Sequence, residues 1–160
     1  MTVDAFIVLK EKYRKVALMG ALSLGVIVLL FGVVIYIRSL GPLRAALPAF
    51  IEAVRIVFFM ASIGQLMLIP YIQGRMMAAK GIEGVIHEQA EIWPGYVDKL
   101  YRAALVTYGL CLIPAFLGFS LYLITRQMSD FSFLAALAFI NFVFYYPRYS
   151  QWEFRMRDFN

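Results

Sequence analysis

Residues 16–37 read VALMGALSLGVIVLLFGVVIYI, an apolar run of 22 residues without a charged side chain. A helix of about 20 apolar residues crosses the roughly 30 Å of hydrocarbon in a bilayer. The run follows a charged segment, as a signal peptide core does, but such a core has only roughly 7–15 residues and ends in a cleavage site of small residues. The run therefore predicts a first, uncleaved transmembrane helix.

Three further apolar stretches, at about residues 49–72, 103–125 and 131–147, are also candidates for membrane spans. The last is short unless it continues through a kink at Pro147. Hydrophobic residues make up 62% of the 160 residues and charged residues 16%, whereas soluble domains have about 45–50% and about 25%. The stretches lack the two-residue alternation of barrel strands. The sequence thus predicts a single all-α domain over 1–160, an integral membrane four-helix protein built from two transmembrane hairpins.

Basic residues are distributed unevenly around the predicted spans. The N-terminal segment, the loop at 73–102 and the C-terminal tail carry eleven of the 15 Lys and Arg residues. Basic residues concentrate on the cytoplasmic side of membrane proteins. The pattern predicts that both termini and loop 73–102 are cytoplasmic. The four basic residues assigned to the other side are Arg38, Arg44, Arg55 and Arg126.

Loop 73–102 has a helical periodicity of its own. Apolar residues recur in it at helical spacing, and acidic residues occupy the other faces. We expect a short cytoplasmic amphipathic helix that ends at Pro94-Gly95. Because its polar face is acidic, it is expected to pack on the rim of the bundle or on a partner rather than on anionic lipid. The apolar positions are Ile82, Val85, Ile86, Ala90 and Trp93.

The two hairpins have matching landmarks. Tyr13-Arg14 precedes Arg38 by the same interval that separates Tyr101-Arg102 from Arg126. The match would arise from a parallel tandem repeat, with the hairpins related by an axis along the membrane normal. It would also arise in unrelated hairpins that share anchoring residues at their ends. Both interpretations stay open at this level.

Polar side chains are few within the predicted spans. No Asp, Glu, Lys or His lies near the centre of a span, although a proton-coupled carrier would need a central carboxylate. Gln65 and Asn141 lie near mid-membrane, where they either line a polar path or form interhelical hydrogen bonds, including one with each other. Glu52 and Arg55 are three residues apart and predict an ion pair at the outer mouth. That pair either contacts a ligand or is local, with Arg55 reaching the headgroups.

Small residues recur every four positions on the first span, at Ala17, Ala21 and Gly25. Small side chains allow the backbones of membrane helices to approach closely. The stripe therefore predicts a helix-packing seam. The sequence leaves open whether this seam lies inside the chain or between subunits.

Groups typical of catalysis or metal binding are sparse. Glu83, His87 and Glu91 share one helix face and could hold a metal with help from another chain, but no second histidine completes such a site. A solvated face is the simpler interpretation. Cys111, the only cysteine, is expected to pack in its apolar run. Since no phosphate-binding loop or activated nucleophile occurs, we expect no catalytic, metal or cofactor site and no nucleic-acid partner.

These features predict a small non-enzymatic multi-pass membrane protein. Its expected partners are the lipid bilayer and either another membrane protein or further copies of itself. It would then act as an accessory or assembly subunit or as an oligomeric scaffold. The alternative is a passive channel or transporter for a neutral or lipophilic solute, with Gln65 and Asn141 on its path.

Overall fold

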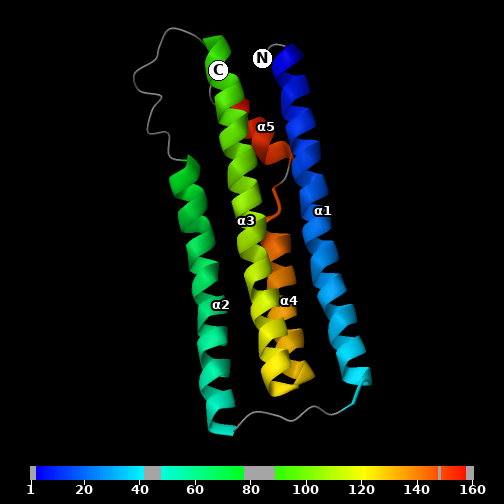
Figure 1. Ribbon diagram of the computed structural model, residues 1–160. Coiled ribbons are helices and arrows are strands. Elements are labelled where there is room, and N and C mark those ends of the chain that lie inside the picture. The colour runs from blue at the N-terminus through cyan, green and yellow to red at the C-terminus, as the bar shows by residue number, and fades with distance from the viewer. Residues whose placement is uncertain (1–2, 42–47, 78–88, 148, 158–160) are drawn as a thin grey trace.

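Helices make up nearly all of the described chain (Figure 1). The structure is a computed structural model that describes residues 3–41, 48–77, 89–147 and 149–157. Within these ranges every regular element is a helix, and four of the helices are long and apolar enough to cross a membrane. The predicted all-α multi-pass architecture is thus confirmed. In chain order the helices are α1 (Val3–Ser39), α2 (Pro48–Met77), α3 (Gln89–Thr125), α4 (Met128–Tyr145) and α5 (Tyr149–Arg157).

Two of the helices are much longer than a membrane span. Helices α1 and α3 have 37 residues each, or about 55 Å at 1.5 Å per residue, against roughly 30 Å of hydrocarbon. Both extend beyond their predicted spans, chiefly at the end of the bundle where the chain begins and where α5 lies (Figure 1). We call this the α5 end.

The prediction that a helix ends at Pro94-Gly95 is wrong, because α3 runs through both residues. Pro94 lies near the start of α3, where a proline leaves only one carbonyl, that of Ala90, without its helical partner. The residues that follow bury Val97 and Leu100, and this packing favours continued helix. The upstream part of the predicted amphipathic helix, including Ile82, Val85 and Ile86, lies outside the described residues.

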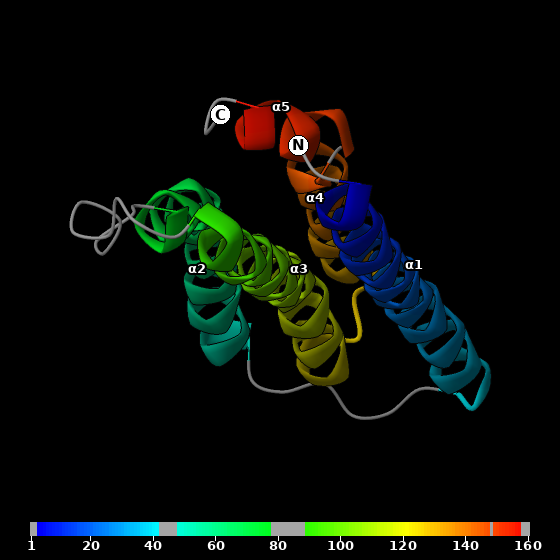
Figure 2. The ribbon, with the colours of Figure 1, turned by 90° about the horizontal axis from the view of Figure 1, so that it is seen from above.

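Helix α3 is the centre of the bundle. It packs along α4, α1 and α2, whereas α1 and α2 lie on either side of it and make no substantial contact with each other (Figures 1 and 2). The second predicted hairpin, α3–α4, is therefore closely packed, and the first, α1–α2, is separated by α3. This arrangement lacks the equivalence of hairpins that a tandem repeat about a two-fold axis requires.

A proline also decides where the fourth span ends. The predicted continuation through Pro147 is wrong, because α4 ends at Tyr145 and Tyr146 has an extended backbone with ψ of 120°. A residue before proline avoids the helical region, since the proline ring would clash with it. The chain then turns into α5, which lies beside the long extensions of α1 and α3 (Figures 1 and 2).

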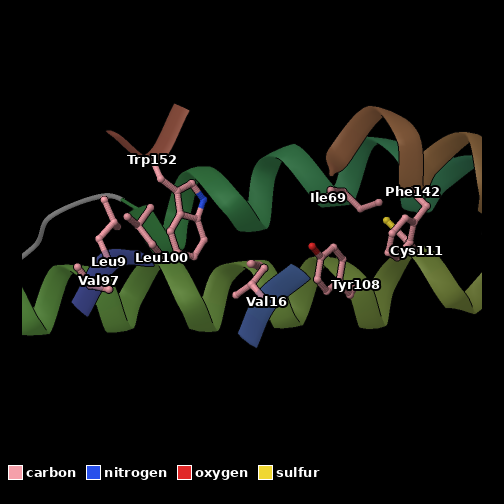
Figure 3. Packing of buried hydrophobic residues seen from close by; sticks show 10 residues of the cluster. Leu9, Val16, Ile69, Val97, Leu100, Tyr108, Cys111, Phe142 and Trp152 are labelled. Carbon is pink, nitrogen blue, oxygen red and sulfur yellow. The ribbon is translucent and has the colours of Figure 1, made fainter. Parts of the chain in front are cut away.

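The α5 end has its own core, which is rich in aromatic residues. The Trp152 side chain lies against Leu9 and Leu100 (Figure 3). Tyr13 packs edge-on against Tyr149 and Trp152, with ring centroids 5.1 and 5.7 Å apart. These contacts hold α5 against α1 and α3.

The other half of the bundle is held by close packing of α1, α3 and α4 around Phe131 and its neighbours. Gly118 of α3 faces α4 so closely that a Cβ atom at this position would stand 2.9 Å from Cβ of Leu134. Glycine here permits a close approach of α3 and α4. The two helices are joined by a short turn at Arg126, whose φ of 59° is in the left-handed region.

Candidate functional site

Helix α2 is the least buried of the four spans. Among its described residues only Ser62, Gln65 and Ile69 are buried. In lipid no hydrophobic force drives apolar helices together. The hydrogen bonds that α2 makes to α3 and α4 therefore carry much of its attachment. They involve Gln65, predicted near mid-membrane, and Arg55, predicted in the ion pair at the outer mouth.

Gln65 compensates for a proline in the neighbouring helix. Its Nε2 donates to the backbone carbonyl of Leu110 in α3. That carbonyl lies four residues before Pro114, which has no N–H to donate. An unsatisfied carbonyl in hydrocarbon costs several kcal/mol. The Gln65 amide thus ties α2 to α3 at the one carbonyl that Pro114 leaves free.

The proline of α2 itself is compensated in the same way. Pro70 leaves the carbonyl of Leu66 without its helical donor. The hydroxyl of Tyr145, near the end of α4, donates to this carbonyl over a long distance of 3.4 Å. A second side chain therefore ties α2 at a carbonyl that a proline has freed. The sequence alone does not show which side chain compensates for either proline, because each donor lies on another helix.

A third hydrogen bond between α2 and its neighbours lies further towards the α5 end. Gln73 Nε2 donates to the Thr107 hydroxyl at 2.9 Å, and that hydroxyl donates to the Ala103 carbonyl at 2.8 Å. Thr107 is almost fully buried. Its hydroxyl is thus both acceptor and donor, and the α2–α3 contact contains a continuous hydrogen-bond chain.

Arg55, predicted to pair with Glu52, lies at the end of the bundle opposite α5. It has a second and more buried partner. Arg55 Nη1 lies 2.8 Å from Glu52 Oε1, while its Nε and Nη2 lie 3.1 and 3.0 Å from Asp130 Oδ2 in α4. Nη2 also donates to Gln127 Oε1 at 2.5 Å. The Glu52 side chain is 64% exposed and that of Asp130 only 10%. Because water screens the first pair more, the pair with Asp130 contributes more to holding α2 against α4.

Asp130 is not among the residues predicted from the sequence, because it falls just before the predicted fourth span. The structure starts α4 three residues earlier, so Asp130 lies in the first helical turn. A carboxylate is stabilised there by the positive end of the helix dipole. An acidic residue at this position, on the same predicted membrane side as Arg55, was the available signal.

Asn141 lies in a different environment from Gln65. It is completely buried in α4, and neither atom of its amide has a hydrogen-bond partner among the described residues. The Oε1 atom of Gln65 is likewise buried without a partner. Gln65 and Asn141 thus form no hydrogen bond with each other, which was one of the alternatives left open by the sequence, and three polar atoms are left free at a high cost in hydrocarbon.

The small-residue stripe of α1 does not contact the rest of the chain. Ala21 and Gly25 are exposed, and no atom lies within 4 Å of a Cβ placed at Gly25 or Gly32. The internal contact of α1 instead uses Gly20, where a Cβ would stand 3.0 Å from the Tyr108 hydroxyl. The predicted seam of Ala17, Ala21 and Gly25 thus points mainly away from the chain's own helices.

Other reactive groups stand apart from these ties. Cys111 is buried in the apolar core with Ile69 and Phe142 (Figure 3). Glu83 and His87 lie outside the described residues, so the trio with Glu91 has no structural description.

No protein-family model matches the chain, and neither a curated protein nor a solved structure shows significant similarity to it.

The pairing of Gln65 with Pro114 predicts a compensating substitution. Replacing Gln65 with Leu should lower the free energy of unfolding by about 1–2 kcal/mol, because the Leu110 carbonyl loses its donor. In a Pro114→Ala background the same replacement should cost much less, since residue 114 then supplies its own N–H. Unfolding by denaturing detergent, followed by circular dichroism, measures all four proteins of this cycle.

Met67 provides the control for this cycle. It lies on α2 and is 78% exposed, so Met67→Leu should leave the unfolding free energy unchanged in both backgrounds. An equal cost of Gln65→Leu with proline or alanine at position 114 would contradict the compensation.

Proposed function

We propose that this multi-pass membrane protein is not an enzyme and acts as an assembly subunit or oligomeric scaffold. The observation that carries the proposal is the uncovered stripe of α1 at Ala21, Gly25 and Gly32. Small-residue stripes are typical of interfaces between membrane helices, because they permit close backbone contact. A stripe that the chain's own helices leave open is suited to a helix of another chain.

The exposure of the remaining α1 surface supports the same proposal. Leu18, Leu22 and Val28 surround the stripe and are more than half exposed. Large side chains beside a small-residue stripe form ridges, between which a second helix fits. The partner would therefore be a transmembrane helix, either of a second copy or of another membrane protein.

The proposal includes the orientation in the membrane. The start of α1 and the whole of α5 lie at the same end of the bundle (Figure 1), and this end carries the predominantly basic segments. By the positive-inside rule it faces the cytoplasm. Both termini would then be cytoplasmic.

This orientation predicts where a reporter is active. An enzyme that folds only in the cytoplasm should be active when it is fused before Met1 or after Asn160. The same enzyme inserted after Arg126, in the short turn between α3 and α4, should be inactive. Loss of reporter activity at either terminus would contradict the proposed orientation.

Association through the α1 stripe predicts a strong effect of added bulk. Leucine at both Ala21 and Gly25 should weaken self-association about tenfold or more, because the larger side chains prevent close approach of the backbones. The protein's own fold should survive, since Gly25 faces open space. Energy transfer between labelled copies in liposomes, measured at decreasing protein density, gives the association constant.

Ala61→Leu is the control, because Ala61 is exposed on α2 and receives the same substitution as Ala21 on a different helix. It should leave association unchanged. Native mass spectrometry of the complex extracted from its own membrane then distinguishes a second copy from another protein. Unchanged association in the Ala21→Leu/Gly25→Leu protein, with no partner lost from the extracted complex, would refute the proposal.

A second candidate function is passage of a neutral solute. The observation that favours it is the set of free polar atoms on Gln65 and Asn141, since a small hydrogen-bonding molecule could satisfy them. In that case Asn141→Leu should abolish flux of small neutral solutes into proteoliposomes while helical content is preserved. Equal flux for the wild-type protein, the variant and empty liposomes would eliminate this function.

A further inference from the structure

One face of α3 is left uncovered between α1 and α2. Its exposed positions follow each other at intervals of three and four residues, so they form a single stripe along the helix. At Gly109, in the middle of this stripe, no atom lies within 4 Å of a Cβ placed on the backbone. We call this stripe the open face; it comprises Arg102, Val106, Gly109, Ile113, Phe116 and Ser120.

The neighbouring helices border the open face without covering it. Helices α1 and α2 lie on either side of α3, and α4 packs against its other side (Figures 1 and 2). Val106, Ile113 and Phe116 are between 39% and 48% exposed. The open face is therefore a long apolar surface at membrane depth, with helices along both edges.

Basic residues gather at the α5 end of this surface. Lys99 and Arg102 lie one helical turn apart on α3, and both are exposed. Arg75, in the last turn of α2, lies at the same end of the bundle, but it is about 200° around α2 from Gln73, the residue that contacts α3, so it belongs to another face of α2. Neither Lys99 nor Arg102 forms a salt bridge with a side chain that the structure describes.

The nearby carboxylate of α3 is paired mainly with another cation. Asp98 is bonded to Lys12 of α1 at 2.8 Å, and its attraction to Arg102 is weaker than its attraction to Lys12. With Lys12 and Asp98 taken as a pair, the cationic side chains of Lys99 and Arg102 are available where the apolar surface begins, close to the start of the predicted third span at residue 103. Clusters of Lys and Arg at this depth, next to apolar helix surfaces, match the charge and geometry of anionic lipid headgroups.

We propose that the open face binds an anionic phospholipid. Its phosphate contacts Lys99 and Arg102, and an acyl chain lies along α3 over Gly109, where the missing side chain permits close contact. A second copy docked on this face by two-fold symmetry about the membrane normal would bring two equal basic clusters together. That repulsion disfavours a protein occupant and favours an anionic one.

The test compares lipids on the full-length protein in neutral detergent. Native mass spectrometry during titration with dioleoylphosphatidylglycerol should detect a lipid that stays bound, and dioleoylphosphatidylcholine should bind at least tenfold more weakly. Each basic residue near an anionic headgroup contributes about a fivefold gain in binding. The Lys99→Gln/Arg102→Gln variant should therefore bind phosphatidylglycerol about 25-fold more weakly.

Two further variants distinguish the contribution of Lys99 and Arg102 from that of the apolar open face. Lys10→Gln/Arg14→Gln removes the same charge from exposed positions of α1 at the same end of the bundle, and it should change binding by less than about twofold. Gly109→Phe fills the open face without a change in charge, and it should also weaken lipid binding. Circular dichroism melting of each variant verifies that its helices are intact.

Three results would overturn the proposal. The first is equal binding of the two lipids, and the second is an equal loss of binding in the Lys10/Arg14 and Lys99/Arg102 variants. The third is full binding by the Lys99/Arg102 variant or by Gly109→Phe. The same mass spectra also show whether the protein is a monomer or an oligomer. They therefore test the proposed self-association through α1 independently of lipid binding.

Discussion

A carbonyl that loses its helical donor in hydrocarbon must find another one, and this constraint determines how α2 is held. Pro114 frees the carbonyl of Leu110, and Pro70 frees that of Leu66. In each case a side chain of a neighbouring helix, Gln65 or Tyr145, donates to the freed oxygen. The two prolines thus specify which helices meet and at what level in the membrane.

The same constraint explains why the two sides of α3 differ. Helix α1 is joined to α3 and α4 by apolar packing in both halves of the bundle. Helix α2 buries few apolar residues and is attached by directional bonds, which end in the Arg55–Asp130 pair. In lipid, where apolar surface alone gives no preference for protein over solvent, such bonds give α2 a defined position although few of its side chains are buried. They also leave most of its surface, and the open face beside it, in contact with lipid.

Glycine has two opposite roles in this fold. At Gly118 and Gly20 the absence of a side chain lets neighbouring helices come into close contact inside the chain. At Gly25 and Gly109 the space beside the backbone is empty within the chain, and it is available to lipid or to another helix. All four are glycines within apolar runs. Only the direction in which each faces decides whether it stabilises the fold or creates an outer surface.

The sequence by itself determined the helical class and the approximate spans, because the length and apolarity of a run suffice to predict a membrane helix. It also indicated Gln65 near mid-membrane and Arg55 near the end of a span, since polar residues are rare within apolar runs. It could not assign Asp130 and Leu110 as their partners, because those contacts join residues far apart in the chain. Nor could the sequence show that the small-residue stripe of α1 faces away from the chain's other helices. These features depend on how the helices are rotated and paired, and that is decided by the packing around α3, which only the tertiary structure contains.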